Sequence, residues 1–111
     1  SAWYEESHSE LGREEVRTDT VAGAALAPNV AGVHVLLVTN TAASTIVGIS
    51  GGVIGQELWI GKSIVAAGTG LTIQGAANLM LANTTAFVMN DSAMYQFICD
   101  NGTRFRQVYA F

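Results

Sequence analysis

Few side chains in this sequence have the types and the spacing that catalysis requires. After residue 21 the only carboxylates are Glu57, Asp91 and Asp100. A glycosidase, the enzyme class considered first, needs two carboxylates facing each other across one cleft. Asp91 and Asp100 stand in sequences typical of turns, and Glu57 follows a glycine turn. We therefore predict no catalytic site and a non-enzymatic protein.

The sequence also has few residues that could bind a metal or a cofactor. His8 and His34 have no cysteine or carboxylate at metal-ligand spacing. Cys99 is the only cysteine, which excludes an internal disulfide, and we expect it to be a small buried side chain. His34 is expected to be a hydrogen-bonded strand residue. An ion site formed by three copies of it around a threefold axis stays open as an alternative. We predict no metal and no cofactor.

One short motif suggests phosphate binding and fails on inspection. Gly61-Lys62-Ser63 resembles the end of a phosphate-binding loop. That loop requires a glycine where this chain has Gln56, and it must open a helix, whereas strands are expected on both sides here. The motif is therefore rejected.

The charges divide the chain into two parts. Residues 1–21 carry six acids and two bases, whereas residues 22–111 carry three of each. Six charged residues in ninety is far below the usual share of about a quarter, so we expect other subunits to cover much of this surface. Without a basic patch, nucleic acid is an unsuitable partner. No apolar run approaches the length of a membrane helix, and we expect no membrane insertion.

The expected architecture is a connector followed by one all-β domain. Residues 1–21 are interpreted as a connector from an upstream domain, with a short helix around Glu5–Val16 as an option. Residues 22–111 form short segments rich in β-branched residues, spaced at about 8–12 residues and separated by small-residue turns. The expected strands are Val33–Thr39, Thr45–Ile49, Glu57–Ile60, Ser63–Ala66, Leu71–Gln74, Leu79–Leu81, Ala86–Met89, Met94–Cys99 and Arg104–Tyr109.

The last two of these strands are expected to form a hairpin. Asn101-Gly102 lies between two apolar runs, and this pair is favoured in two-residue turns because both residues accept positive φ. Such a turn places Cys99 opposite Arg104 and Ile98 opposite Phe105. Both faces of the hairpin are then largely apolar, which again favours burial between chains.

Three segments resemble one another within the chain, at Ser44–Gly48, Lys62–Val65 and Leu71–Gly75. Each combines a small polar residue with isoleucine, as in Thr45-Ile46 and Thr72-Ile73. Repetition of this kind is typical of the coils of a β-helix or prism, although any strand rich in threonine and isoleucine looks similar.

The stretch from Ala22 to the end resembles a C-terminal module of phage tail fibres, tailspikes and pectate-lyase-like proteins. The resemblance rests on five segments in the family's order: Gly23–Gly32, Asn40–Ile46, Ile49–Leu58, Ala93–Phe97 and Asp100–Phe105. The third contains the Gly-Gly-x-x-Gly-Gln pattern at 51–56. Phe105 departs from the family, where Trp-Tyr is usual, and so does the chain end Val108–Phe111.

The resemblance implies a homotrimer that holds the C-terminal ends of three fibre chains together on the virion and, in some members, binds the host surface. The fold expected is a small antiparallel β-sandwich or β-prism-like domain; side-by-side sandwiches and interleaved strands stay open. A carbohydrate-binding module for bacterial surface polysaccharide is the alternative function. The residues expected at the trimer interface are Val35, Leu37, Ile46, Ile49, Leu58, Ile60 and Ile73. Those expected to stack on a glycan are Trp59, Tyr95, Phe105 and Tyr109.

Overall fold

The computed structural model describes residues 16–23, 25–63, 70–82, 86–89, 94–101 and 104–108. Within these ranges the regular structure consists of strands without a helix, so the fold is all-β as predicted. The strands are β1 (Val16–Val21), β2 (Ala25–Leu26), β3 (Val35–Asn40), β4 (Ser44–Ile46), β5 (Glu57–Lys62), β6 (Leu71–Ile73), β7 (Leu79–Met80), β8 (Phe87–Met89), β9 (Met94–Cys99) and β10 (Phe105–Gln107).

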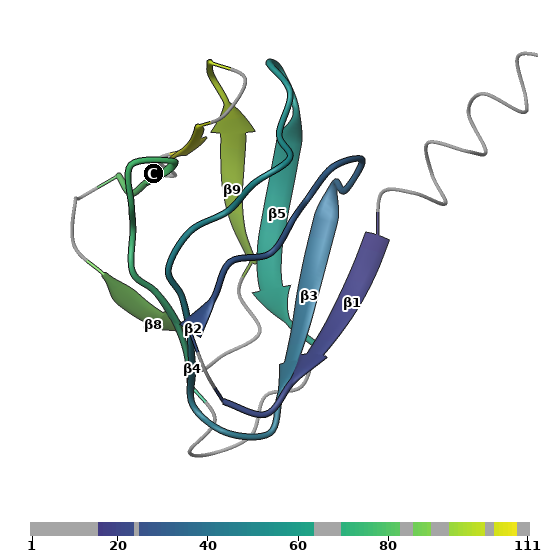
Figure 1. The fold of residues 1–111 in the computed structure, drawn as a ribbon, viewed down its shortest axis with the longest axis vertical. Helices are drawn as coiled ribbons and strands as arrows, with labels where there is room; N and C mark the ends of the chain where they lie inside the picture. Colours follow the sequence, from purple (N-terminus) through teal and green to yellow (C-terminus); the bar gives the residue numbers. More distant parts are fainter. Residues whose placement is uncertain are drawn as a thin grey trace, which may run out of the picture.

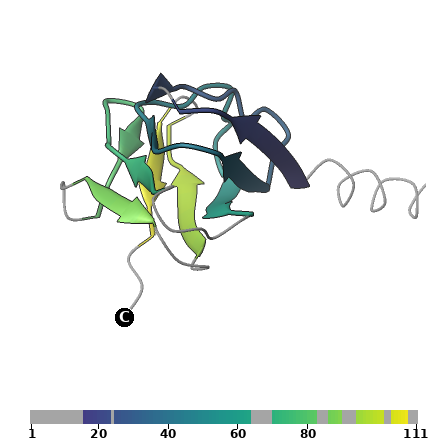
Figure 2. The ribbon, with the colours of Figure 1, turned by 90° about the horizontal axis from the view of Figure 1, so that it is seen from below.

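The strands form two sheets that face each other. The six-stranded sheet has the order β1-β3-β5-β9-β10-β7, and the four-stranded sheet has the order β2-β4-β6-β8. Figure 1 shows β1, β3, β5 and β9 side by side, with β2, β4 and β8 in the opposing layer, and Figure 2 shows the same layers from below.

The first six strands wind as a coil. Odd-numbered strands enter one sheet and even-numbered strands the other, so that β1, β3 and β5 pair in parallel, as do β2, β4 and β6. This is the connectivity of a short two-sheet β-solenoid. Only β9, β8 and β10 add antiparallel pairs to it. The expected antiparallel pairing is therefore wrong for the pairs among the first six strands, which are parallel, and the sheets are mixed.

The internal repeat explains the parallel register. Ser44 pairs with Leu71, Thr45 with Thr72 and Ile46 with Ile73, so the first and third similar segments stack residue on residue. In both strands the isoleucine is fully buried and the threonine between the buried positions faces outward. The coil interpretation is confirmed for these two segments. The middle segment runs from the end of β5 into residues outside the described ranges.

The β domain begins earlier than predicted. Val16–Val21 pairs along its whole length with Val35–Asn40, although the sequence interpretation assigned it to the connector. Its outward side chains alternate with Arg17 and Asp19, whose guanidinium and carboxylate bond to each other at 2.9 Å and 3.1 Å. This ion pair accommodates charged residues in a strand, and the paired β structure includes residues 16–21.

The final hairpin forms with a register shifted by one residue. Phe105 pairs with Cys99 and Arg106 with Ile98, whereas a two-residue turn required Phe105 opposite Ile98. Asp100 N–H donates to Arg104 O at 3.0 Å, which makes the loop three residues long. Arg104 N–H also donates to Asn101 Oδ1 at 2.9 Å. The shift turns Phe105 inward beside Cys99 and places Arg106 on the outside, so the predicted register was wrong.

The core lies between the two sheets and is built from apolar side chains; the polar residues that are also buried in the described ranges are Asn40, Ser44 and Lys62. Its largest members are Phe97, Phe105, Leu36, Ile46, Ile49, Leu58, Ile60, Leu71, Ile73, Leu79 and Met89. Cys99 is buried among them as a free thiol, the placement expected from the sequence.

The Gly-Gly-x-x-Gly-Gln segment closes one end of this core. Gly51 has φ +85°, and a Cβ there would press on Asn29. Gln56 Nε2 donates to Val30 O at 2.8 Å and to Val33 O at 2.7 Å, while its Oε1 accepts from Val53 N–H at 3.1 Å. One amide thus supplies partners to three backbone groups of two loops. In this chain the motif has a structural role.

Candidate functional site: the outer face of the six-stranded sheet

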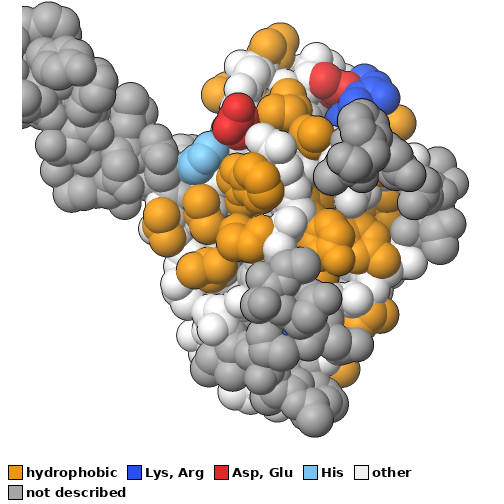
Figure 3. All heavy atoms as spheres, turned by 180° about the vertical axis from the view of Figure 1, so that it is seen from behind, with side chains coloured by type: hydrophobic (Ala, Val, Ile, Leu, Met, Phe, Trp, Pro, Cys, Tyr) orange, Lys and Arg blue, Asp and Glu red, His pale blue; other side chains and the backbone are white. Residues whose placement is uncertain are grey.

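The side of the six-stranded sheet that points away from the core carries a continuous set of apolar side chains. Strand alternation turns Leu36, Leu58 and Phe97 inward and their neighbours outward. We call these outward residues the outer face: Val16, Val35, Leu37, Trp59, Met94, Ile98 and Val108. Figure 3 shows apolar side chains spread over this side of the molecule, with few charges among them.

Trp59 lies near the middle of the outer face. Val35 pairs with Val16 on one side and with Trp59 on the other, and Trp59 pairs with Gln96. Val108 continues this row, because its N–H donates to Gln96 O at 2.8 Å. In the next row, Gly61 lies between Leu37 and Met94. Val16 is 55% exposed, and Met94 and Val108 are each 38% exposed.

Polar and charged groups border the face at both ends. At one end, Thr39 and Ser63 bond to each other through their hydroxyl groups. At the other end, His34 Nδ1 lies 3.2 Å from Glu57 O, and its Nε2 lies 4.0 Å from Glu57 Oε1. We call His34 and Glu57 the acidic edge.

A second charged group lies across the sheet from the acidic edge. Arg104 donates to the Asp100 carboxylate from Nε and Nη2, both at 3.0 Å, and Arg106 donates from Nε at 2.9 Å. The hydrogen bond from Arg104, followed by that from Arg106, holds the pKa of Asp100 below its ordinary value. We call Asp100, Arg104 and Arg106 the basic edge, since two cations surround one anion.

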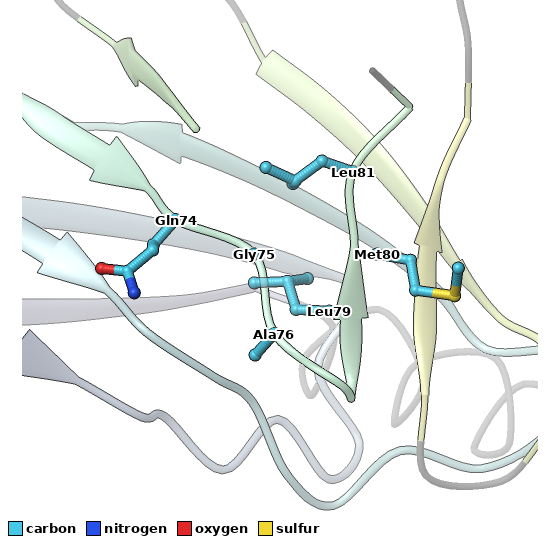
Figure 4. A pocket seen from close by; sticks show the side chains of 6 residues that line it. All are labelled: Gln74, Gly75, Ala76, Leu79, Met80 and Leu81. Atoms are coloured by element: carbon cyan, nitrogen blue, oxygen red, sulfur yellow. The ribbon is translucent and has the colours of Figure 1, made fainter. Parts of the chain in front are cut away.

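Three of the hollows on the described surface are mostly apolar. One of about 380 Å³ adjoins the acidic edge and includes Val53 and Ile54, which are 65% and 72% exposed. One of about 290 Å³ lies at 74–81 and is lined by Gln74, Gly75, Ala76, Leu79, Met80 and Leu81 (Figure 4). One of about 250 Å³ lies between β1 and β2, where Asp19 is its one ionisable lining residue. None of the three holds a pair of carboxylates.

The structure divides the residues predicted at the trimer interface into two groups. Val35 and Leu37 lie on the outer face. The other five are 0–1% exposed inside the chain's own core and are not available to another subunit in this fold: Ile46, Ile49, Leu58, Ile60 and Ile73. The physical reason is that a strand buried by its own opposing sheet has the same apolar sequence as one buried by a partner.

The residues predicted to stack on a glycan are also separated. Trp59 is partly exposed on the outer face. Tyr95 turns to the other side of β9, where its ring lies 4.7 Å from that of Phe87. Phe105 is fully buried, and Tyr109 lies outside the described residues. The four rings do not form one platform.

Val16 and Val108 were missed as members of the outer face. Val16 was missed because its strand was assigned to the connector, although Val16, Thr18 and Thr20 alternate with the charged positions. Val108 was missed because the two-residue turn expected from the sequence places it opposite Tyr95, on the other side of the hairpin, whereas its N–H bonds to Gln96 O in the structure. The period-two pattern of Met94, Gln96 and Ile98 was readable from the sequence and is realised in β9.

The described carboxylates have surroundings unlike those of a catalytic pair. A general acid needs a raised pKa, whereas two arginines lower that of Asp100. Glu57 is half exposed beside His34, and Asp91 lies outside the described residues. Among the residues placed by the structure, no three His, Cys, Asp or Glu side chains gather as metal ligands would. The same part of the chain contains no helix that is long and apolar enough to span a membrane.

Comparison with known proteins adds no relative. No protein-family model matches this sequence, and no curated protein matches it. The outer face is therefore interpreted from its own chemistry.

Proposed function

We propose that this chain is a non-catalytic structural module that holds the C-terminal ends of three chains of a phage tail fibre or tailspike together on the virion. The single observation that carries the proposal is the outer face, an apolar sheet surface centred on Trp59. The sequence resemblance supports the phage context and the number three. Host attachment would follow from the position of such a module at the end of a fibre.

The outer face has the composition of a protein interface. Interfaces have an apolar centre with aromatic anchors and a polar border, and charged residues are depleted at their centre. Here Trp59 pairs with Val35 and Gln96, Leu37 and Ile98 lie diagonally across the neighbouring strands, and the charged groups lie at the border. Tryptophan is also the residue type most enriched among side chains that dominate binding energy. A surface of this kind is unfavourable in water, which supports a covered state.

A second copy of the same chain suits this face better than a glycan does. Sugar binding needs exposed rings with polar groups around them, and of the predicted rings only Trp59 is placed on the outer face. The polysaccharide-binding alternative thus has less support than self-association.

The decisive measurement is the oligomeric state. Native mass spectrometry at micromolar concentration should show a trimer for the wild type. Trp59→Glu should shift it to monomer, because burying an indole typically contributes several kcal/mol and an unpaired carboxylate opposes burial. Val88→Glu is the matched control, since Val88 is 52% exposed on the four-stranded sheet. A wild type that stays monomeric would contradict the proposal, as would a Trp59→Glu variant that stays trimeric.

A further inference from the structure

We infer that neighbouring subunits meet with the acidic edge of one against the basic edge of the next, so that Glu57 faces Arg106 across each contact. The inference rests on the proposed function, because it specifies which parts of the outer face meet. It assigns a pairing between subunits that the trimer by itself does not require.

The two edges lie at the same height along the strands. Glu57 pairs with Ile98, and Ile98 pairs on its other side with Arg106. The three residues therefore form one row across β5, β9 and β10, with the two charges about 10 Å apart at the backbone. Both charged side chains are more than half exposed, at 51% for Glu57 and 55% for Arg106. Ile98 separates them with an apolar side chain.

Rotation about an axis parallel to the strands preserves this height. Three copies can be arranged with their outer faces toward such an axis. In this ring, one side of the outer face of each subunit contacts the opposite side of the outer face of the next subunit. In the order of the sheet, Glu57 on β5 lies on the side toward β3. Arg106 on β10 lies on the side toward β7, where it pairs with Met80. Each contact then joins an acidic edge to a basic one, and three identical contacts close the ring.

The charges of the two edges are complementary. The acidic edge carries one negative charge when His34 is neutral, and the basic edge carries two positive charges against one negative. Arg104 already bonds both oxygens of Asp100. The Arg106 guanidinium has five N–H groups and donates from Nε to that carboxylate, which leaves it well suited to a second carboxylate.

The surroundings of Glu57 strengthen such a contact. Val53 and Ile54 are the most exposed large apolar side chains in the described part of the chain, and they line the hollow beside the acidic edge. A neighbouring subunit that covers them also removes water from Glu57. An ion pair shielded from water is stronger than one on an open surface.

Charge reversal tests the pairing. Glu57→Arg and Arg106→Glu should each raise the concentration at which half of the trimer dissociates by about tenfold or more, because like charges then meet at every contact. The double variant Glu57→Arg/Arg106→Glu should return to within about threefold of the wild type. Val88→Arg and Val88→Glu are the controls for added charge, since they lie on the other sheet and should change this concentration little.

Arg106→Glu also puts a second carboxylate beside Asp100, so a double-mutant cycle with neutral substitutions is measured as well. It compares Glu57→Gln, Arg106→Gln and the double variant. Once one of the two substitutions is present, adding the other should weaken the trimer little further. Circular dichroism confirms that each variant is folded. If the wild type is a trimer but the losses of trimer stability are additive in both the charge-reversal and the neutral variants, the pairing of Glu57 with Arg106 is overturned and the proposed function stands. A monomeric wild type would overturn both.

Discussion

Gly52 should be the position in this fold least tolerant of a single added carbon. A Cβ built there would lie 2.7 Å from Phe105 Cζ and 3.1 Å from Cys99 Sγ. Carbon atoms in contact normally lie about 3.5–4.0 Å apart. The ring must therefore move by about 1 Å, yet Phe105 is fully buried among core residues and has no free space around it.

The expected cost of Gly52→Ala follows from this geometry. Overpacking a core typically costs about 1–3 kcal/mol, and the closeness of the contact places this substitution at the upper end. Replacing a glycine also restricts the unfolded chain, which offsets about 0.4–1 kcal/mol. The free energy of unfolding should fall by about 2 kcal/mol. Gly48→Ala is the control, because its Cβ would meet Asn78 Oδ1 at 3.4 Å, a contact that needs little adjustment.

A double-mutant cycle isolates the cause. Phe105→Leu removes the ring atoms that the new Cβ would meet and should by itself cost about 1–2 kcal/mol. In that background Gly52→Ala should cost less than about 0.5 kcal/mol, a coupling of roughly 1.5–2 kcal/mol. The assay is urea unfolding followed by tryptophan fluorescence at one fixed protein concentration, since association shifts apparent stability. Additive effects of the two changes would refute the packing argument.

Two further predictions concern the loops that close the core and the basic edge. Gln56→Ala should lower the free energy of unfolding by about 2–3 kcal/mol in the same urea assay, because Val33 O and Val53 N–H lose the side-chain amide and Val30 O keeps only its bond from Val33 N–H. Gln74→Ala, at an exposed glutamine, should change the free energy of unfolding by less than about 0.5 kcal/mol. Equal effects of the two substitutions would contradict the role assigned to Gln56. Asp100 should make stability depend on pH, because its pKa in the folded state lies below the ordinary value of 3.8. The contribution of the Asp100 carboxylate to the free energy of unfolding is therefore present above about pH 4 and is lost as the pH falls through the folded pKa. Thermal unfolding of Asp100→Asn and the wild type should therefore differ at pH 7 and converge near pH 2, and a constant difference would contradict this.

The sequence predicted most strands because turn residues and β-branched runs are local signals. Met94–Cys99 has the predicted bounds, and Leu71–Ile73 differs by one residue. The stacking of Thr45 on Thr72 was also visible, because equivalent residues of successive coils share the same surroundings. These features depend on residues close together in the chain or on direct repetition.

The remaining errors depend on contacts between distant segments. Arg17 donates to Asn29 O at 2.7 Å as well as to the Asp19 carboxylate. The sequence around residue 17 does not indicate which strand this segment pairs with, because β3 lies about 20 residues further along the chain. The Asn101-Gly102 preference was overridden by a three-residue loop that turns Phe105 into the core. Ile46 and Ile73 were assigned to a partner interface because burial within one chain and burial between chains select the same side chains.

The low charge of residues 22–111 has one cause within the chain itself. Part of it belongs to the chain's own core, which takes the inward positions of both sheets. The outward positions differ between the two sheets. On the four-stranded sheet the paired row Ala25, Thr45, Thr72 and Val88 contains two hydroxyl side chains and a valine that is 52% exposed. On the six-stranded sheet the outward positions include Val35, Leu37, Trp59, Met94 and Ile98, together with the polar Thr39 and Gln96 and the charged Glu57 and Arg106. Large apolar side chains are thus more numerous on the six-stranded sheet. The trimer proposed above would account for them, because it covers the face on which Trp59 lies.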